Sequence, residues 1–253
     1  MLKNKTCIVT GAASGIGLII SKYFVKDGAK IVMCDINEEQ LKIEADKLNA
    51  IFFLADLTQR EQCKDLVDFS INKFKKIDIL LNIAGMQSIA PIEEFSEDRW
   101  DLMISLMLTA PFLLTKYVWP SMKKQKWGRI INLNSIQGLI ASKYKSAYVA
   151  AKHGLGGLTK AAALEGGEYG ITVNSICPAY VKTPLVENQI DEQAKNHGIS
   201  KDDVIRDIML KNSAIKKLIE PSHIAEIAKF LCSDAASHIT GSMLTIDGGW
   251  TAN

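Results

Sequence analysis

Short apolar segments that favour β-strands alternate with helix-like segments along almost the whole chain of 253 residues. The strand-like segments are 6–10, 30–35, 51–54, 77–81, 129–133, 171–176 and 242–246. The helix-like segments are 15–26, 38–48, 59–74, 98–123, 148–169, 187–197, 201–211 and 221–232. Strands this apolar are typical of a parallel sheet that helices cover on both faces. Because no linker or repeat interrupts the pattern, we predict a single α/β domain over residues 1–253.

A glycine-rich turn joins the first predicted strand to the first predicted helix. Its sequence is Thr10-Gly-Ala-Ala-Ser-Gly-Ile-Gly17, with glycines at 11, 15 and 17. Glycine lets the backbone approach a pyrophosphate, and the helix N-terminus supplies N–H groups and the positive end of its dipole. The spacing differs from the commoner Gly-x-Gly-x-x-Gly, so ordinary turn chemistry is the alternative interpretation. The position between a strand and a helix favours dinucleotide binding.

Asp35 ends the second predicted strand, where a carboxylate that binds a ribose is expected. Such a carboxylate accepts hydrogen bonds from the ribose hydroxyls and repels a 2′-phosphate. Neither the turn nor the neighbours of Asp35 supply a basic residue, so we predict NAD rather than NADP. The alternative is that Asp35 caps the helix that begins near Glu38.

A second signal is the pair formed by Tyr148 and Lys152. Alanines between and beside them favour helix, so the two side chains should share one face, a turn apart. A cation at this distance is expected to lower the pKa of the phenol, which could then serve as an acid/base group. The alternative is an ordinary amphipathic helix, which often contains such a pair by chance.

The charge and the cysteines narrow the class of protein. The net charge of +2 does not indicate nucleic acid or an acidic membrane as the main partner. We expect no membrane span, since no apolar run of about 18 residues was found, and no signal-peptide pattern. The five cysteines are dispersed, which predicts reduced thiols and a cytoplasmic location. The four histidines lack the spacing of metal ligands, so no metal is predicted.

Beyond these patterns, the chain resembles the short-chain dehydrogenase/reductase family over essentially its whole length. The matching motifs are Thr10–Gly17, Asp56-Leu57, Asn82-Ile-Ala-Gly85, Ser135, Tyr148-x-x-x-Lys152, Cys177-Pro178, Thr183 and Asp247-Gly-Gly249. The resemblance implies a Rossmann-type, doubly wound domain with seven parallel strands. It implies that Tyr148 is the acid/base, that Lys152 holds the ribose and tunes Tyr148, and that Ser135 orients the substrate oxygen.

The same resemblance implies a cofactor site. Asp56 is expected to reach the adenine and Thr183 the nicotinamide carboxamide. The full expected set for NAD is Gly11, Ser14, Gly15, Ile16, Gly17, Asp35, Asp56, Leu57, Asn82, Ala84, Gly85, Tyr148, Lys152, Pro178, Val181 and Thr183.

Several segments are similar to bacterial D-3-hydroxybutyrate dehydrogenases in particular. They are Gly85–Gln87, Ala90–Phe95, Lys145–Gly154, Thr183–Gln189 and Asp247–Ala252. This resemblance implies a substrate site of Gln87, Ser135, Gln137, Lys145, Tyr148, Tyr180, Gln189 and Trp250. The carboxylate would be held by Gln87, Lys145 and Gln189, and the methyl end would pack on Tyr180 and Trp250. The alternatives are a solvated lysine, a surface glutamine, and a tryptophan at a subunit contact.

The chain departs from these relatives at four places in the expected site, of which Ile83 is the mildest. Gln137 stands where the hydroxybutyrate enzymes usually have His, and Met107 where the wider family has a catalytic Asn. The thioether of Met107 cannot donate a hydrogen bond, so a proton relay behind Lys152 would need the backbone carbonyl instead. Ile83 replaces the second Asn of its turn, and the strand end at Asp35 matches general NAD-dependent members better.

The sequence therefore predicts NAD-linked, reversible oxidation of (R)-3-hydroxybutyrate to acetoacetate. A lid is expected over residues 185–211. The family resemblance implies a homotetramer built on the long helix and the Tyr148 helix. Two alternatives stay open: a short-chain reductase acting on a 3-oxoacyl or sugar substrate, and a cofactor-binding protein with weak or no catalysis.

Overall fold

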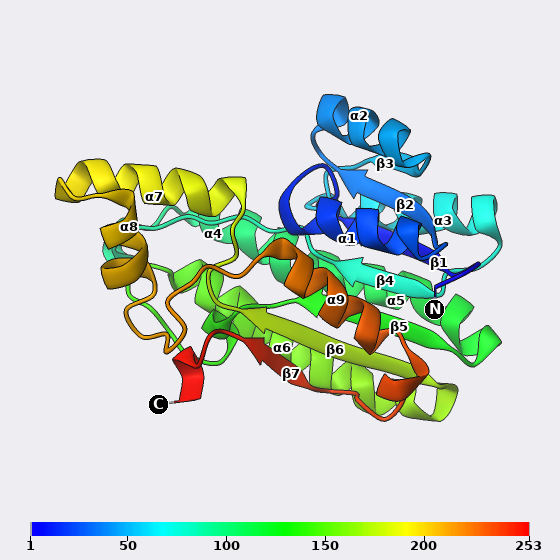
Figure 1. Cartoon of the computed structure of the whole chain (residues 1–253). Coiled ribbons are helices and arrows are strands. Elements are labelled where there is room, and N and C mark those ends of the chain that lie inside the picture. Colours follow the sequence, from blue (N-terminus) through cyan, green and yellow to red (C-terminus); the bar gives the residue numbers. More distant parts are fainter. Residues whose placement is uncertain (1, 253) are drawn as a thin grey trace.

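Seven parallel strands form one sheet in the order β3-β2-β1-β4-β5-β6-β7 (Figure 1). The structure is a computed structural model that describes residues 2–252, without the side chains of Leu185, Glu192, Asn196 and His197. The strands are β1 (Thr6–Thr10), β2 (Lys30–Asp35), β3 (Ile51–Leu54), β4 (Ile79–Asn82), β5 (Gly128–Leu133), β6 (Ile171–Pro178) and β7 (Met243–Ile246). This arrangement confirms the predicted Rossmann-type sheet.

Helices cover both faces of the sheet. One face carries α1 (Gly15–Lys26), α2 (Glu38–Leu48) and α9 (Pro221–Leu231), and Figure 1 shows α1 and α9 side by side across it. The other face carries α3 (Arg60–Phe74), α5 (Ala110–Gln125) and α6 (Ser146–Gly166). Each face buries its own apolar cluster, because a parallel strand presents apolar side chains to both sides.

Short 3-10 helices complete the chain at Ile92–Glu94, Ile136–Gly138, Gly167–Tyr169, Asp234–Ala236 and Trp250–Ala252. Most predicted boundaries agree with the structure to within a few residues. The fourth strand begins at Ile79 rather than Ile77. The backbone of Ile77 instead bonds to α5, through the Ser121 hydroxyl and the Gln125 amide, which removes it from the strand ladder.

The predicted helix 98–123 is interrupted. It consists of α4 (Glu97–Ile104), a π-helical turn (Ser105–Thr109) and α5. Pro111 has no N–H to donate to the Met107 carbonyl four residues earlier, so the α-helical pattern cannot continue through this point. The Ala110 N–H accordingly bonds to the Ser105 carbonyl, five residues back.

The same helical stretch corrects our expectation about membrane spans. By length and composition alone, Glu97–Gln125 could cross a membrane, with a mean hydropathy of 1.5 in its most apolar window. Lys116 interrupts the apolar run between Leu102 and Trp119 without cancelling its mean hydropathy. In the fold, the apolar side chains of α5 pack against α3 and the sheet, and those of α4 pack against α6. Packing in the core therefore accounts for part of the apolar stretch, of which 44% is buried.

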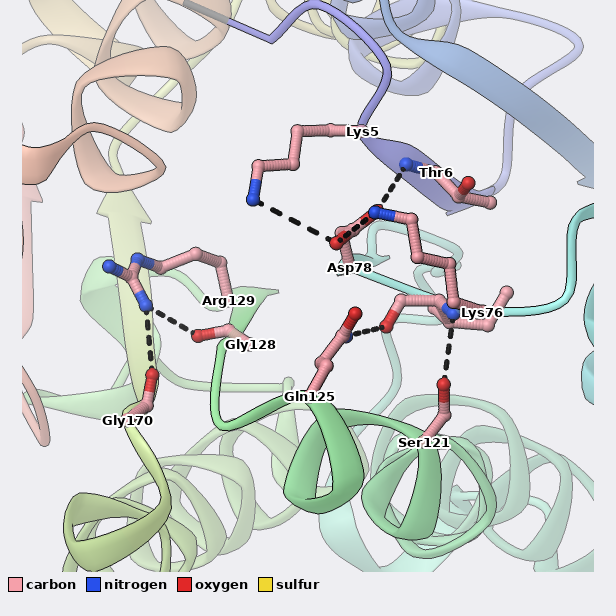
Figure 2. A network of polar contacts seen from close by, with 10 residues as sticks. Lys5, Thr6, Lys76, Asp78, Ser121, Gln125, Gly128, Arg129 and Gly170 are labelled. Atoms are coloured by element: carbon pink, nitrogen blue, oxygen red, sulfur yellow. Dashed lines mark hydrogen bonds and ion pairs between the residues drawn. The ribbon is translucent and has the colours of Figure 1, made fainter.

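A polar network connects the N-terminal ends of the strands (Figure 2). Asp78 is almost fully buried and accepts a hydrogen bond of 2.8 Å from the Thr6 N–H. Its carboxylate also lies 2.9 Å from the Lys76 ammonium and 3.8 Å from that of Lys5. Nearby, the Arg129 guanidinium donates to the Gly128 and Gly170 carbonyls. These contacts tie together the first residues of β1, β4, β5 and β6.

The Trp127 ring also lies at the N-terminal ends of the strands, between two cations. The Lys5 ammonium lies 3.3 Å from the centre of the Trp127 indole, and the Arg129 guanidinium carbon lies 4.4 Å from it. Both distances are short enough for cation–π attraction, which partly compensates for the burial of the Arg129 guanidinium.

Replacing Asp78 by asparagine is expected to lower the free energy of unfolding by about 1–3 kcal/mol, because the Lys5 and Lys76 ammonium groups lose a buried counter-charge. Urea denaturation of both proteins measures the change. Asp68→Asn is the matched control, since the Asp68–Lys64 pair is exposed and should contribute little. Equal effects of the two substitutions would contradict the role assigned to Asp78.

Candidate active site

A cavity of about 570 Å³ opens at the carboxyl ends of the strands, where the chain order reverses between β1 and β4. This is the position at which open α/β sheets bind their ligands. The expected site residues that line it are Gly11, Ser14, Gly15, Ile16, Gly17, Asp35, Asp56, Leu57, Ala84, Gly85, Ser135, Tyr148, Lys152, Pro178, Val181 and Thr183. Asn82 does not line the cavity: it is buried in β4 and donates a 2.8 Å hydrogen bond to Asn132.

The turn between β1 and α1 requires glycine at two positions. Gly11 has φ +63°, and a Cβ there would lie 2.9 Å from the Ala84 Cα. A Cβ on Gly17 would lie 2.1 Å from the Gly11 carbonyl oxygen. Ser14 begins α1 without a side-chain cap, and the first turn has no acidic residue. A close backbone cradle at an uncapped helix N-terminus fits the pyrophosphate of a dinucleotide.

The structure excludes the helix-cap interpretation of Asp35. Its carboxylate accepts hydrogen bonds of 3.0 Å from the N–H groups of Ala13 and Asn37. The cap of α2 is Asn37, which accepts from the Gln40 N–H. Asp35 therefore holds the glycine-rich turn and lines the cavity, and it is not the helix cap. Among the described residues that line the cavity, Lys152 on α6 is the single cation.

Asp56 follows β3 and is held in a turn of its own. Its carboxylate accepts from the Thr58 N–H at 2.9 Å and from the Thr58 hydroxyl at 2.7 Å. Thr183 lies at the start of α7 (Pro184–His197), where its hydroxyl donates to the Val181 carbonyl at 3.3 Å. The structure places these two residues on different walls of the same cavity.

Ser135, Tyr148 and Lys152 come together between β5 and α6. Ser135 is the second residue after the end of β5, and its hydroxyl accepts a hydrogen bond of 3.2 Å from the Gln137 N–H. Tyr148 and Lys152 lie one turn apart on α6, with the ammonium 5.5 Å from the centre of the phenol ring. The Lys152 ammonium donates to the Leu133 carbonyl at 2.6 Å. Strand and helix thus present a hydroxyl, a phenol and a cation to one cavity.

The pKa of Tyr148 differs in direction from our expectation. Burial raises the pKa of the Tyr148 phenol above its ordinary value, while the Ser135 hydroxyl acts in the opposite direction. Burial also lowers the pKa of Lys152 to about 8. The predicted lowering of the Tyr148 pKa by Lys152 is therefore wrong for this structure, because burial of the phenol outweighs the groups that favour its ionised form.

Met107 lies in the π-helical turn and is buried with Met103, Ala147 and Ala151, against Tyr148. A Cβ on Gly85 would lie 3.5 Å from the Met107 sulfur, so Met107 packs behind Gly85 without lining the cavity itself. An apolar side chain here supplies no hydrogen-bond donor, as the sequence predicted. Ile83 lines the cavity and belongs to the apolar core.

Three residues expected at the substrate lie together beside the cavity. The Lys145 ammonium is 5.8 Å from the centre of the Tyr180 ring. The centres of the Tyr180 and Trp250 rings are 6.0 Å apart. Burial lowers the pKa of Lys145 from its ordinary value. A cation and two aromatic rings therefore meet near the start of α6.

The amide side chains of the expected substrate site are in different settings. Gln137 is buried and donates to the Ser142 hydroxyl at 2.8 Å, but its carbonyl oxygen has no partner. The carbonyl oxygen of Gln87 is also buried without a partner. Gln189 lies on α7 and is half-buried. Gln87, Gln137, Lys145, Tyr180, Gln189 and Trp250 do not themselves line the main cavity.

The expected lid is a helical segment at the open end of the cavity. It contains α7, α8 (Lys201–Asp203) and a π-helical turn, Val204–Met209. Figure 1 shows α7 and α8 beyond the arrowheads of the strands. Val186, Ile190, Val204 and Met209 form a small apolar cluster of their own, separate from the two main clusters. The mobility of this segment stays a prediction.

Some residues of the cavity were not predicted from the sequence. They are Ile36, Ala55, Thr58, Ile83, Met86, Leu102, Leu106, Leu133, Asn134, Ala179, Pro184 and Val186. Asn134 carried a usable signal, because it stands next to Ser135 at the carboxyl end of a strand. Leu102 and Leu106 carried none, since they belong to an amphipathic helix pattern. Among the described residues, no group of three or more His, Cys, Asp or Glu side chains forms a metal site.

The fold and the site define a nicotinamide-dependent oxidoreductase of the Rossmann type. The family model described as enoyl-(acyl carrier protein) reductase matches residues 11–251, and the chain belongs to the short-chain dehydrogenase/reductase family. It is 44% identical to a D-beta-hydroxybutyrate dehydrogenase of Rhizobium meliloti (strain 1021), over 98% of this chain and 99% of that protein. It is 39% identical to a protein of the same name from Cupriavidus necator, over the full length of both.

A relative with a different name is also similar. The chain is 33% identical to a 3-oxoacyl-[acyl-carrier-protein] reductase of Thermotoga maritima, over 98% of both chains. The comparisons thus confirm the family. The names of these relatives refer to two different substrates, D-beta-hydroxybutyrate and 3-oxoacyl-[acyl-carrier-protein].

Proposed function

We propose that this protein catalyses the NAD-linked, reversible oxidation of (R)-3-hydroxybutyrate to acetoacetate. The observation that carries the proposal is the group of Lys145, Tyr180 and Trp250 beside the Tyr148 helix. A short hydroxy acid needs a cation for its carboxylate and an apolar wall for its methyl end. Two relatives named D-beta-hydroxybutyrate dehydrogenase support the same substrate.

In the proposed reaction, NAD supplies the hydride acceptor. Tyr148 as a phenolate takes the proton of the substrate hydroxyl, so the alcohol loses one proton and one hydride to become a ketone. The Ser135 hydroxyl donates a hydrogen bond to the same oxygen and stabilises charge there. Lys152 fixes the end of β5 through its bond to Leu133 and supplies positive charge next to Tyr148.

A 3-oxoacyl substrate is the second candidate, because the Thermotoga relative bears that name. The proposed contact between Lys145 and a carboxylate distinguishes the two functions, since a neutral thioester carries no charge that the half-buried ammonium could pair with. The test is NADH formation from a panel of (R)-3-hydroxybutyrate, its S enantiomer, its methyl ester and a 3-hydroxyacyl thioester. The R acid should be oxidised fastest. Preference for the thioester or the ester would overturn the proposal in favour of a general carbonyl reductase, and no turnover of any substrate would favour a cofactor-binding role.

NAD is expected to bind in strong preference to NADP, because the Asp35 carboxylate would face the 2′-phosphate with no lining cation on that side. Calorimetric titration with both cofactors measures the preference. Asp35→Asn is the matched variant, since the amide oxygen can still accept from the Ala13 or Asn37 N–H while the charge is lost. The variant should bind NADP better. Equal affinities of the unmodified protein for the two cofactors would contradict the role of Asp35.

We also propose a homotetramer built on the long helix and α6. A groove of about 290 Å³ runs between α5 and α6, lined by Phe112, Thr115, Lys116, Trp119, Leu158, Ala161, Ala162 and Glu165. Leu164 on the exposed face of α6 is 86% exposed. Light scattering tests the assembly.

The cytoplasmic location stays a prediction. The five buried, unpaired thiols are compatible with it.

A further inference from the structure

Asn134 occupies the first position after β5, between Leu133 and the hydroxyl-bearing Ser135. It lines the cavity with only 2% of its surface exposed. Its amide nitrogen donates a hydrogen bond of 3.0 Å to the Lys152 carbonyl. Its amide oxygen accepts one of 2.8 Å from the Ser135 N–H. One buried side chain thus bonds to the backbone of two of the three proposed catalytic residues.

Lys152 returns a bond to the same strand end. Its ammonium donates to the Leu133 carbonyl at 2.6 Å, while its own carbonyl accepts from Asn134. The end of β5 and the middle of α6 are therefore joined in both directions. The amide orientation is fixed by these partners, because one is a carbonyl that needs a donor and the other is an N–H that needs an acceptor.

The packing around this amide leaves it no other position. A Cβ on Gly138 would lie 2.3 Å from the Asn134 amide oxygen and 2.9 Å from the Lys152 carbonyl oxygen. Glycine at 138 therefore gives the amide the room in which to bridge strand and helix. On the other side, the Asn134 nitrogen lies 4.0 Å from the Met243 sulfur on β7.

We infer that Asn134 is a positioning residue, which sets the spacing between the Ser135 hydroxyl and the Tyr148 phenol. It holds the Ser135 backbone directly, and it holds Tyr148 through α6, one turn before Lys152. The inference rests on the proposed roles of Ser135, Tyr148 and Lys152. Without the amide, the Ser135 N–H loses its partner in a buried site, and the strand end is free to shift relative to the helix.

The test compares Asn134→Ala with Asn174→Ala. Asn174 is a matched control: it is 1% exposed, donates to the Ile239 carbonyl at 2.7 Å and accepts from the Ser242 N–H at 3.1 Å. It bridges backbone groups in the same way but does not line the cavity. Both variants should lose similar thermal stability. Only Asn134→Ala should lose kcat, by about 10- to 100-fold, since a misplacement near 1 Å costs this much.

Two further measurements separate positioning from general damage. The deuterium isotope effect on kcat, measured with substrate deuterated at the reacting carbon, should rise in Asn134→Ala because hydride transfer becomes slower. The dissociation constant of NADH should stay close to that of the unmodified protein. Loss of kcat in both variants in proportion to their lost stability would overturn the inference, as would an unchanged isotope effect.

Hydrogen exchange tests, without any turnover, the clamp that Asn134 forms between the end of β5 and α6. Peptides that span 133–139 and 148–152 should exchange faster in Asn134→Ala than in Asn174→Ala. Unchanged exchange in these peptides would overturn the inference even if the enzyme is active. If the unmodified protein oxidises no hydroxy acid but exchange in these peptides rises, the proposed substrate fails and the clamp stands.

Discussion

Replacing Tyr148 by phenylalanine is expected to reduce turnover by about 10²- to 10⁴-fold, the usual cost of removing one acid/base group. The phenol is the group on this face of α6 that can take the substrate proton, and it lines the cavity beside Ser135. Phenylalanine keeps the ring that packs against Met107 and Ala151. The fold and the affinity for NADH should therefore stay nearly unchanged.

The measurement is kcat at saturating NAD, with NADH titration and thermal unfolding as controls. Tyr144→Phe is the matched variant, since Tyr144 lies four residues earlier with 56% of its surface exposed. It should keep full activity. A Tyr148→Phe protein that retains more than about a tenth of the activity would contradict the assignment of the acid/base group.

The pKa of Tyr148 also gives the expected pH dependence. Oxidation needs the phenolate, so kcat should rise as pH rises through the pKa of Tyr148. Because burial raises that pKa, the rise should occur at higher pH than it would for a phenol whose pKa was lowered. Tyr148→Phe should abolish this limb of the profile, which a merely structural effect would not do.

Replacing Lys145 by alanine is expected to reduce kcat/KM for the hydroxy acid by about 10- to 150-fold, because a charge-assisted bond to a carboxylate contributes about 1.5–3 kcal/mol. Lys145 stands immediately before α6, three residues ahead of Tyr148, so its side chain can reach a carboxylate close to the reacting carbon. The methyl ester should be a poor substrate of the unmodified protein. The kcat/KM for the ester should fall little further in Lys145→Ala.

The four values of kcat/KM for acid and ester form a double-mutant cycle with the substrate as one partner. Lys143→Ala is the matched control, because Lys143 is an exposed lysine two residues earlier. An equal loss for acid and ester would show that Lys145 does not recognise the carboxylate. Recognition should also weaken as pH rises through the Lys145 pKa, and burial places that pKa below the ordinary value of lysine.

Much of the cofactor half of the site could be predicted because its signals are local. The glycine-rich turn needs glycine at 17 for reasons of space within the turn itself, and at 11 because of the positive φ there. Asp35 is predicted at the end of β2, and the structure excludes its role as the helix cap, because its carboxylate bonds to Ala13 and Asn37 is the cap. The sequence alone could not choose, because Ala13 lies 22 residues away along the chain.

Less of the substrate half could be predicted, because its geometry depends on packing between distant segments. Tyr180 and Trp250 are separated in sequence, yet their rings meet, and the Lys145 ammonium lies above one of them. The pKa of Tyr148 was wrong in direction because spacing on a helix shows a neighbouring cation but not the degree of burial. Asn134 was missed because its role appears only when β5 and α6 are seen in contact.

The Trp127 indole, with Lys5 and Arg129 close to its ring, gives the protein a natural optical probe. Indole emission responds to nearby charge, so its signal should report on the edge of the sheet where the strands begin. Trp250, in contact with Tyr180, should report on the other edge. A chain with single tryptophans retained at 127 or 250 would show, in one titration each, whether ligand-driven motion at the lid reaches the far side of the sheet or stops within the site.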